Sequence, residues 1–179
     1  MPGGIMDKQQ LRAMQTPLKE RYRRDPSTAR VTIHAAGRAS TGLAFTVDTH
    51  QGPVEAGLHP SAGGDGTLAG AEEMLLETLV ACSGVTLRAV ATSLGIELRE
   101  ARIFAEGDLD VRGTLAVAKD VPVGFQEIRL RFELDAEATE EQLDRLLELT
   151  ERYCIVLQTL RAPTHIRSTR VHPAPVHAE

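Results

Sequence analysis

The chain has 179 residues, of which 42% are apolar and 25% are charged, and its formal net charge is −5. This length and composition are typical of one globular domain, so we predict a single domain over residues 1–179. The acidic balance excludes the strong basic excess of most nucleic-acid-binding proteins, and we expect no nucleic-acid partner.

The N-terminal segment MPGGIMDKQQ contains no apolar run of signal-peptide length, and no later segment has the uninterrupted apolar length of a membrane span. We therefore expect a cytoplasmic protein with no membrane partner. In such a reducing compartment a structural disulfide is disfavoured, and a pair of cysteines favours a catalytic or sensing role.

The first third of the chain is expected to begin with a helix and to continue as strands. Apolar residues at helical spacing predict a helix over residues 8–25, in which Pro17 either kinks the helix or starts a second one. Residues 30–57 alternate between apolar and polar side chains, which predicts a meander with one buried face and a turn at residues 37–40. The face expected to be buried carries Val31, Ile33, Leu43, Phe45 and Val47.

A glycine-rich segment at residues 60–70 precedes the longest apolar segment. Its glycine spacing matches neither a dinucleotide-binding fingerprint nor a P-loop, so we interpret it as a strand-to-helix loop and expect no cofactor. Residues 71–94 predict one long helix that ends at Gly95. Apolar residues cover nearly its whole circumference, and we therefore expect it to be buried on most sides, at the centre of a dimer.

Two strands and a second clear helix complete the predicted domain. Residues 103–111 and 128–134 alternate in polarity and predict an antiparallel pair. Residues 140–153 predict an amphipathic helix that begins at a capping box, TEEQ, at residues 139–142. Residues 164–171 favour a final edge strand. Helices and antiparallel strands in this order predict an α+β fold.

The only two cysteines, Cys82 and Cys154, are the candidate reactive groups. They lie 72 residues apart, in the middle of the long helix and at the end of the second helix, so only tertiary contact can join them. The chain has no CxxC spacing and no Cys/His cluster, and we expect no metal site. The simplest alternative is inert burial, because a cysteine packs like a small apolar residue.

The sequences around both cysteines resemble the OsmC/Ohr superfamily, which comprises osmotically inducible protein C and the organic hydroperoxide resistance proteins. The resemblance rests on LLETLVACSGVT, from Leu75 to Thr86, and on RYCIVLQTL, from Arg152 to Leu160, and the order of elements fits over residues 30–171. It implies an OsmC-like α+β fold in which antiparallel sheets pack around two long central helices of an intertwined homodimer. The helix over residues 8–25 is additional to the minimal pattern.

The resemblance also implies a chemistry. Cys82 is similar to the family's peroxidatic cysteine, whose thiolate attacks an organic hydroperoxide and becomes a sulfenic acid. Cys154 is similar to the resolving cysteine, which condenses with that sulfenic acid to a disulfide. A dithiol reductant, of the lipoyl type in the family, then restores both thiols.

A thiolate inside an apolar helix requires a nearby cation, because burial raises the pKa of a thiol. Arg38 resembles the family's activating arginine, although an exposed turn residue is an equal alternative. Glu72 matches the family's supporting glutamate by its spacing of ten residues before Cys82. Ten helical residues span ~15 Å, so Glu72 can reach a Cys82 only in a second subunit. The alternative for Glu72 is charge compensation at the helix start.

Two departures from the family pattern indicate an OsmC-like branch. Ile155 follows the second cysteine where the family usually has proline, and Gly70 and Ala71 stand where it has Asn-Pro. Two other functions therefore stay open. One is a non-catalytic protein that binds a hydrophobic small molecule, and the other is a redox sensor that signals through the disulfide.

Overall fold

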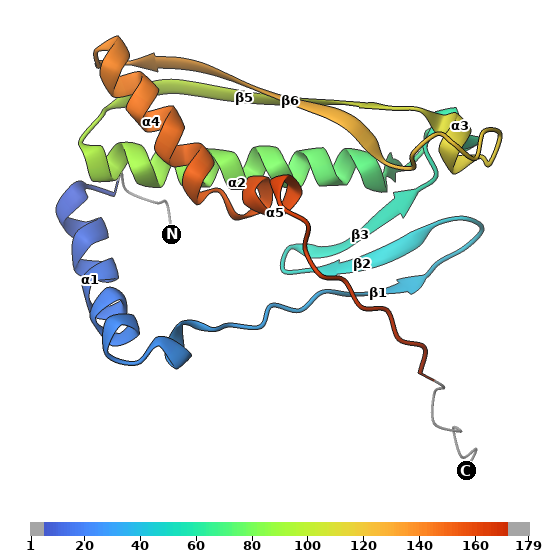
Figure 1. Cartoon of the computed structure of the whole chain (residues 1–179), viewed down its shortest axis with the longest axis horizontal. Helices are drawn as coiled ribbons and strands as arrows, with labels where there is room; N and C mark the ends of the chain where they lie inside the picture. Colours follow the sequence, from blue (N-terminus) through green and yellow to red (C-terminus); the bar gives the residue numbers. More distant parts are fainter. Residues whose placement is uncertain (1–5, 172–179) are drawn as a thin grey trace.

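The computed structural model describes residues 6–171, which form a mixed α and β architecture around one long central helix (Figure 1). The ends of the predicted domain, residues 1–5 and 172–179, lie outside the described residues. The chain begins with α1 (Lys8–Arg24), which starts at a capping box between Asp7 and Gln10. The predicted N-terminal helix is thus confirmed, and it continues through Pro17 as a single helix.

A four-stranded sheet follows and contains the largest departure from the sequence prediction. Its strands lie in the order β1 (Ala36–Ala39), β2 (Phe45–Thr49), β3 (Gly52–Gly57) and β4 (Ala69–Gly70), and β4 pairs with β3 in parallel. The turn predicted at residues 37–40 is wrong, because β1 occupies it. The chain reverses instead around Gly42, whose φ of 64° suits glycine, and residues 31–35 have no regular structure.

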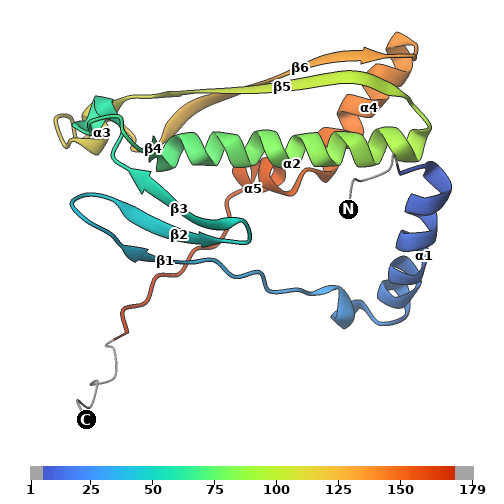
Figure 2. The same cartoon turned by 180° about the vertical axis from the view of Figure 1, so that it is seen from behind.

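The burial predicted for this sheet is also wrong within the single chain. Ile33 is 87% exposed, Leu43 77% and Phe45 47%, whereas Thr46, on the opposite face of β2, is buried. The sheet projects below one end of the central helix, away from the main body of the chain (Figures 1 and 2). Its apolar face therefore has no partner within the described residues.

The central element is α2 (Ala71–Leu94), whose bounds agree with the sequence prediction. Glu73 caps its N-terminus by accepting a hydrogen bond from the Gly70 N–H at 2.7 Å, and Gly95 ends it in a left-handed conformation. Within the single chain this helix is buried along one face, and its burial on most sides at the centre of a dimer stays a prediction. The fully or nearly fully buried residues lie along one face and are Leu79, Ser83, Leu87, Val90 and Ala91.

A long hairpin covers α2 on one side. Its strands are β5 (Leu98–Leu109) and β6 (Phe125–Ala136), whose antiparallel pairing confirms the prediction, and the short α3 (Val111–Thr114) lies in the connection. The inner face packs apolar side chains such as Ile103 and Phe132 against α2. The outer face carries exposed ion pairs, which contribute little to stability.

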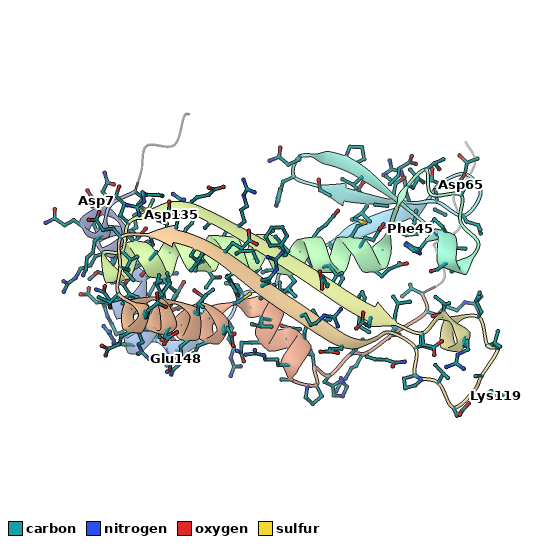
Figure 3. All side chains as sticks on the ribbon, turned by 90° about the horizontal axis from the view of Figure 1, so that it is seen from above. Asp7, Phe45, Asp65, Lys119, Asp135 and Glu148 are labelled. Carbon is teal, nitrogen blue, oxygen red and sulfur yellow. The ribbon has the colours of Figure 1, made fainter. Side chains whose placement is uncertain are left out.

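The chain then returns along α2 as two consecutive helices. The first, α4 (Glu140–Tyr153), begins at the predicted capping box, in which the Thr139 hydroxyl accepts from the Gln142 N–H. The second, α5 (Ile155–Arg161), follows after a single residue, Cys154. Figure 3 shows Glu148 of α4 and Phe45 of β2 on opposite sides of α2. The edge strand predicted over residues 164–171 is wrong, since that segment has no regular structure.

Two buried clusters join these elements. The first lies near the C-terminal end of α2 and comprises Leu87, Val90, Ala91, Ile96 and Leu146, and the second comprises Leu79, Cys154 and Leu157. Contrary to the expectation from the sequence, α2 does reach the length and hydropathy of a membrane span, with a window mean hydropathy of 1.5. Only 22% of that window is buried within the single chain, where α2 packs against β5, α4 and α5.

Candidate active site

Cys154 occupies the junction between α4 and α5. Its extended backbone, with φ −70° and ψ 108°, ends one helix and caps the next, while its N–H donates to the Thr150 carbonyl at 2.9 Å and its carbonyl accepts from the Gln158 N–H at 2.9 Å. This one-residue break turns the chain while both backbone groups of Cys154 stay paired. The Cys154 side chain is fully buried against α2.

Cys82 lies in the middle of α2 and is half-buried. It packs against the cluster of Leu79, Cys154 and Leu157, together with Ile128 and Leu130 of β6. The fold therefore brings the two sequence-predicted thiols into one apolar cluster, although 72 residues separate them along the chain. Both cysteines are free thiols.

Hydrogen-bond donors surround the Cys154 sulfur. Burial by itself raises the pKa of this thiol, but hydrogen bonds from the Ser83 hydroxyl, the Leu157 N–H, the Cys82 thiol and the Val156 N–H outweigh burial, and the net pKa of Cys154 is lowered. The Ser83 Oγ lies 3.5 Å from the Cys154 Sγ. The surroundings of Cys154 therefore stabilise its thiolate more than those of an ordinary buried cysteine.

Ser83 was not identified from the sequence, although a signal for it exists. Leu79, Ser83 and Leu87 follow one another at intervals of four residues and share the buried face of α2. A serine between two buried leucines on such a face requires a polar partner. Only the fold shows that this partner is the sulfur of Cys154.

Arg38 and Glu72 lie apart from the thiols. Arg38 is exposed on β1 and pairs with Asp48 of β2 at 2.8 Å. Glu72 is half-buried in the first turn of α2, where its neighbour Glu73 supplies the cap. Among residues 6–171, no hydrogen bond or ion pair connects either residue with Cys82 or Cys154. Within one chain, these two sequence candidates therefore do not complete the site.

A groove of about 340 Å³, lined by both apolar and polar side chains, opens beside the thiol cluster. Leu79 and Leu157 belong to both the cluster and the groove wall. At the rim, Arg161 forms an ion pair with Glu151 at 2.8 Å. The remaining apolar wall comes from Phe125, Ile128, Leu130 and Leu160. Gln126 and Glu127 complete the lining, so the groove suits a molecule with both an apolar and a polar part.

Comparison of the sequence with models of known families identifies a family that includes the region of this site. A family model described as OsmC-like protein matches residues 64–169, which is more than half of the chain and includes both cysteines. A search of curated proteins found no significant match.

Solved structures share the fold. An OsmC-like protein from Mycoplasma pneumoniae aligns with a TM-score of 0.64 at 17% identity, over 74% of this chain and 89% of that chain. An organic hydroperoxide resistance protein from Elizabethkingia anophelis aligns with a TM-score of 0.60 at 19% identity, over 75% of this chain and 92% of that chain. One from Legionella pneumophila gives a TM-score of 0.52 at 18% identity, over 74% and 92%.

Proposed function

The chain belongs to the OsmC-like protein family, and from this premise we propose that it is a thiol-dependent peroxidase that reduces organic hydroperoxides. The observation that carries the proposal is the meeting of Cys82 and Cys154 in one buried cluster. Two unrelated structural cysteines have no need to be neighbours, whereas a sulfenate and disulfide cycle requires it.

The proposed cycle has two steps on the protein. The Cys82 thiolate attacks the terminal oxygen of ROOH, so that an S–O bond forms, the O–O bond breaks and the alkoxide leaves as ROH after it takes up a proton. The Cys154 thiolate then attacks the sulfur of Cys82–SOH, so that a disulfide forms and hydroxide leaves as water. A dithiol of the lipoyl type, oxidised to its own disulfide, restores both thiols.

The different exposure of the two thiols supports this assignment of roles. Cys82 is half-buried and lies on a helix face that is partly open, whereas Cys154 is fully buried behind it. A peroxide therefore meets Cys82 first. The lowered pKa of Cys154 suits a residue that has to attack the sulfenic acid from inside the cluster.

A homodimer is part of the proposal, because α2 presents an uncovered stripe. Along this stripe, Val85 is 73% exposed, and Leu75 and Ala81 are also exposed, next to the half-buried Cys82. A second copy seated on this stripe would cover apolar area, which is the main driving force of association. It would also supply Arg38 and Glu72 from another subunit, since the ~15 Å between Glu72 and Cys82 prevents contact within one helix.

The dimer is tested by Val85→Glu, which places a carboxylate in the middle of the stripe. We expect this variant to elute as a monomer, while the wild type elutes as a dimer, in size-exclusion chromatography with light scattering, because burying an unpaired charge is unfavourable. The matched control is Val117→Glu, since Val117 is 71% exposed but lies away from α2, in the connection after α3. A monomeric wild type, or a Val85→Glu variant that stays dimeric, contradicts the proposal.

The peroxidase function is tested by peroxide consumption with a dithiol present. We expect wild type to consume cumene hydroperoxide at least about tenfold faster than hydrogen peroxide, since the apolar side chains packed with Cys82, such as Leu79, Ile128 and Leu130, favour the organic group. Intact mass after one equivalent of peroxide is expected to show the loss of both thiol hydrogens. If consumption does not exceed that of the dithiol alone, the family membership has identified the fold without the activity.

The groove, whose wall includes Leu79, Leu157 and Leu160, also favours a second candidate function, the binding of a hydrophobic small molecule without turnover. Such a protein needs no thiolate, so its affinity for an apolar fluorescent probe is expected to be the same in wild type and in Cys82→Ser. The peroxidase proposal expects peroxide consumption to differ completely between the same two proteins. For either function, free thiols are compatible with the reducing cytoplasm.

A further inference from the structure

Ser83 is the only fully buried polar side chain on α2 among the described residues. It follows Cys82 directly in the sequence, but its side chain lies on the face of the helix that α4 and α5 cover. Its Oγ lies 3.5 Å from the Cys154 Sγ. Within residues 6–171, no other hydrogen-bond partner of this hydroxyl is found, and no buried polar atom lacks a partner.

This contact differs from the usual behaviour of a hydroxyl in a helix. Serine and threonine in helices commonly donate to the carbonyl four residues earlier. In this chain Thr86 donates to Cys82, Thr150 to Leu146 and Thr159 to Ile155, each at 2.8 Å. The hydroxyl of Ser83 is directed instead at a sulfur atom of another element, across the interface between α2 and the junction of α4 and α5.

The direction of the hydrogen bond follows from the state of the sulfur. A thiolate has no hydrogen and only accepts, so Ser83 is then the donor. The N–H groups of Val156 and Leu157 and the thiol of Cys82 also act on this sulfur. Ser83 is the only side-chain hydroxyl in that group, and its removal takes away a donor that nothing else in the apolar cluster replaces.

We propose that Ser83 is a positioning residue, whose hydrogen bond stabilises and orients the Cys154 sulfur toward Cys82 for the disulfide-forming step. The inference rests on the proposed peroxidase function for its purpose, but the hydrogen bond itself can be tested without any turnover. In the step concerned, the S–S bond forms, the S–O bond of Cys82–SOH breaks and the hydroxide takes up a proton to leave as water. Ser83 gains and loses no covalent bond.

The first experiment titrates Cys154 alone, in a Cys82→Ala background. The far-ultraviolet absorbance of the thiolate is followed against pH, and the curve of the Cys82→Ala/Cys154→Ala variant is subtracted to remove the tyrosines. Adding Ser83→Ala is expected to raise the midpoint by about one pH unit, since a hydrogen bond to a charged group is lost. Adding Ser83→Thr, which keeps the hydroxyl, is expected to leave the midpoint near its original value.

The matched control is Thr150→Val. Thr150 is also fully buried and also loses a hydroxyl, but that hydroxyl bonds to the Leu146 carbonyl and not to sulfur. This variant is expected to lose stability in a thermal melt without moving the Cys154 midpoint. A midpoint that is the same with and without the Ser83 hydroxyl overturns the proposal, as does an equal shift in Thr150→Val.

The second experiment uses the protein with both cysteines present. It measures the lifetime of the Cys82 sulfenic acid after a single addition of cumene hydroperoxide. With Ser83→Ala we expect about tenfold slower disulfide formation near neutral pH, because the thiolate fraction falls tenfold for each unit by which the pKa exceeds the pH. The difference is expected to disappear at a pH above both midpoints, which a merely structural effect would not do. If no sulfenic acid forms at all, the proposed peroxidase function fails, and the titration still decides the role of Ser83.

Discussion

Cys82→Ser is expected to lower the rate of organic hydroperoxide reduction more than about 1,000-fold, since the other described thiol, Cys154, is fully buried behind it and is not open to the peroxide. A serine hydroxyl in the same position is not ionised near neutral pH and cannot form a sulfenic acid. The apolar packing of Cys82 against Leu79, Ile128 and Leu130 is nearly unchanged by the substitution. The measurement is dithiol-dependent consumption of cumene hydroperoxide, with circular dichroism to show that the variant is folded.

Cys154→Ser is the matched variant, because it makes the same atomic change at the other thiol of the cluster. We expect it to consume about one equivalent of peroxide per chain quickly and then to turn over slowly, since Cys82 still reacts but its sulfenic acid is not resolved within the protein. A sulfenic acid reagent is expected to label Cys82 persistently in this variant and only transiently in wild type. If Cys82→Ser retains wild-type turnover, or if Cys154→Ser is the inactive form and Cys82→Ser is not, the assigned roles are wrong.

The second large effect concerns stability. Leu146→Ala is expected to lower the free energy of unfolding by roughly 2–5 kcal/mol, because it removes a fully buried side chain from α4 and leaves a cavity against Leu87 and Val90 of α2. The total free energy of unfolding of a folded domain is only about 5–15 kcal/mol, so this loss is a large fraction of it. The measurement is urea denaturation followed by circular dichroism.

The control for Leu146→Ala is Arg145→Ala, on the same turn of α4. The Arg145 side chain is exposed and pairs with Glu148 at the surface, so its removal is expected to change the free energy of unfolding by less than about 1 kcal/mol. Equal stabilities of the two variants would mean that the cluster around Leu146 does not anchor α4. That anchor matters for the site, since α4 ends at Cys154.

The helices were predictable from the sequence because their end signals are local. Thr139 and Gln142 satisfy the first backbone groups of α4, and Gly95 adopts the left-handed conformation that ends α2. These signals depend on a few neighbouring residues and on no distant contact. The antiparallel pairing of β5 and β6 was predictable for a similar reason, since most of each strand alternates between an inner apolar and an outer charged face.

The strands before α2 were not predictable in the same way. Residues 31–35 and β2 both alternate in polarity, but alternation predicts a strand only if another surface covers the apolar face. Within the single chain nothing described covers Ile33, Leu43 or Phe45. The pairing was decided instead by the reversal at Gly42, which shifted the first strand to residues 36–39.

The sequence by itself determined the candidate reactive groups, since the chain has only two thiols. It also determined the helices in which, or at the end of which, they lie. Whether those thiols meet was decided by tertiary structure alone: the one-residue break at Cys154 turns its sulfur toward α2, where the buried face that carries Ser83 receives it. The physical reason is the distance along the chain over which each kind of interaction acts. Caps and helical periodicity act over a few residues, whereas a contact across 72 residues exists only after the apolar faces of α2, α4 and α5 have packed together.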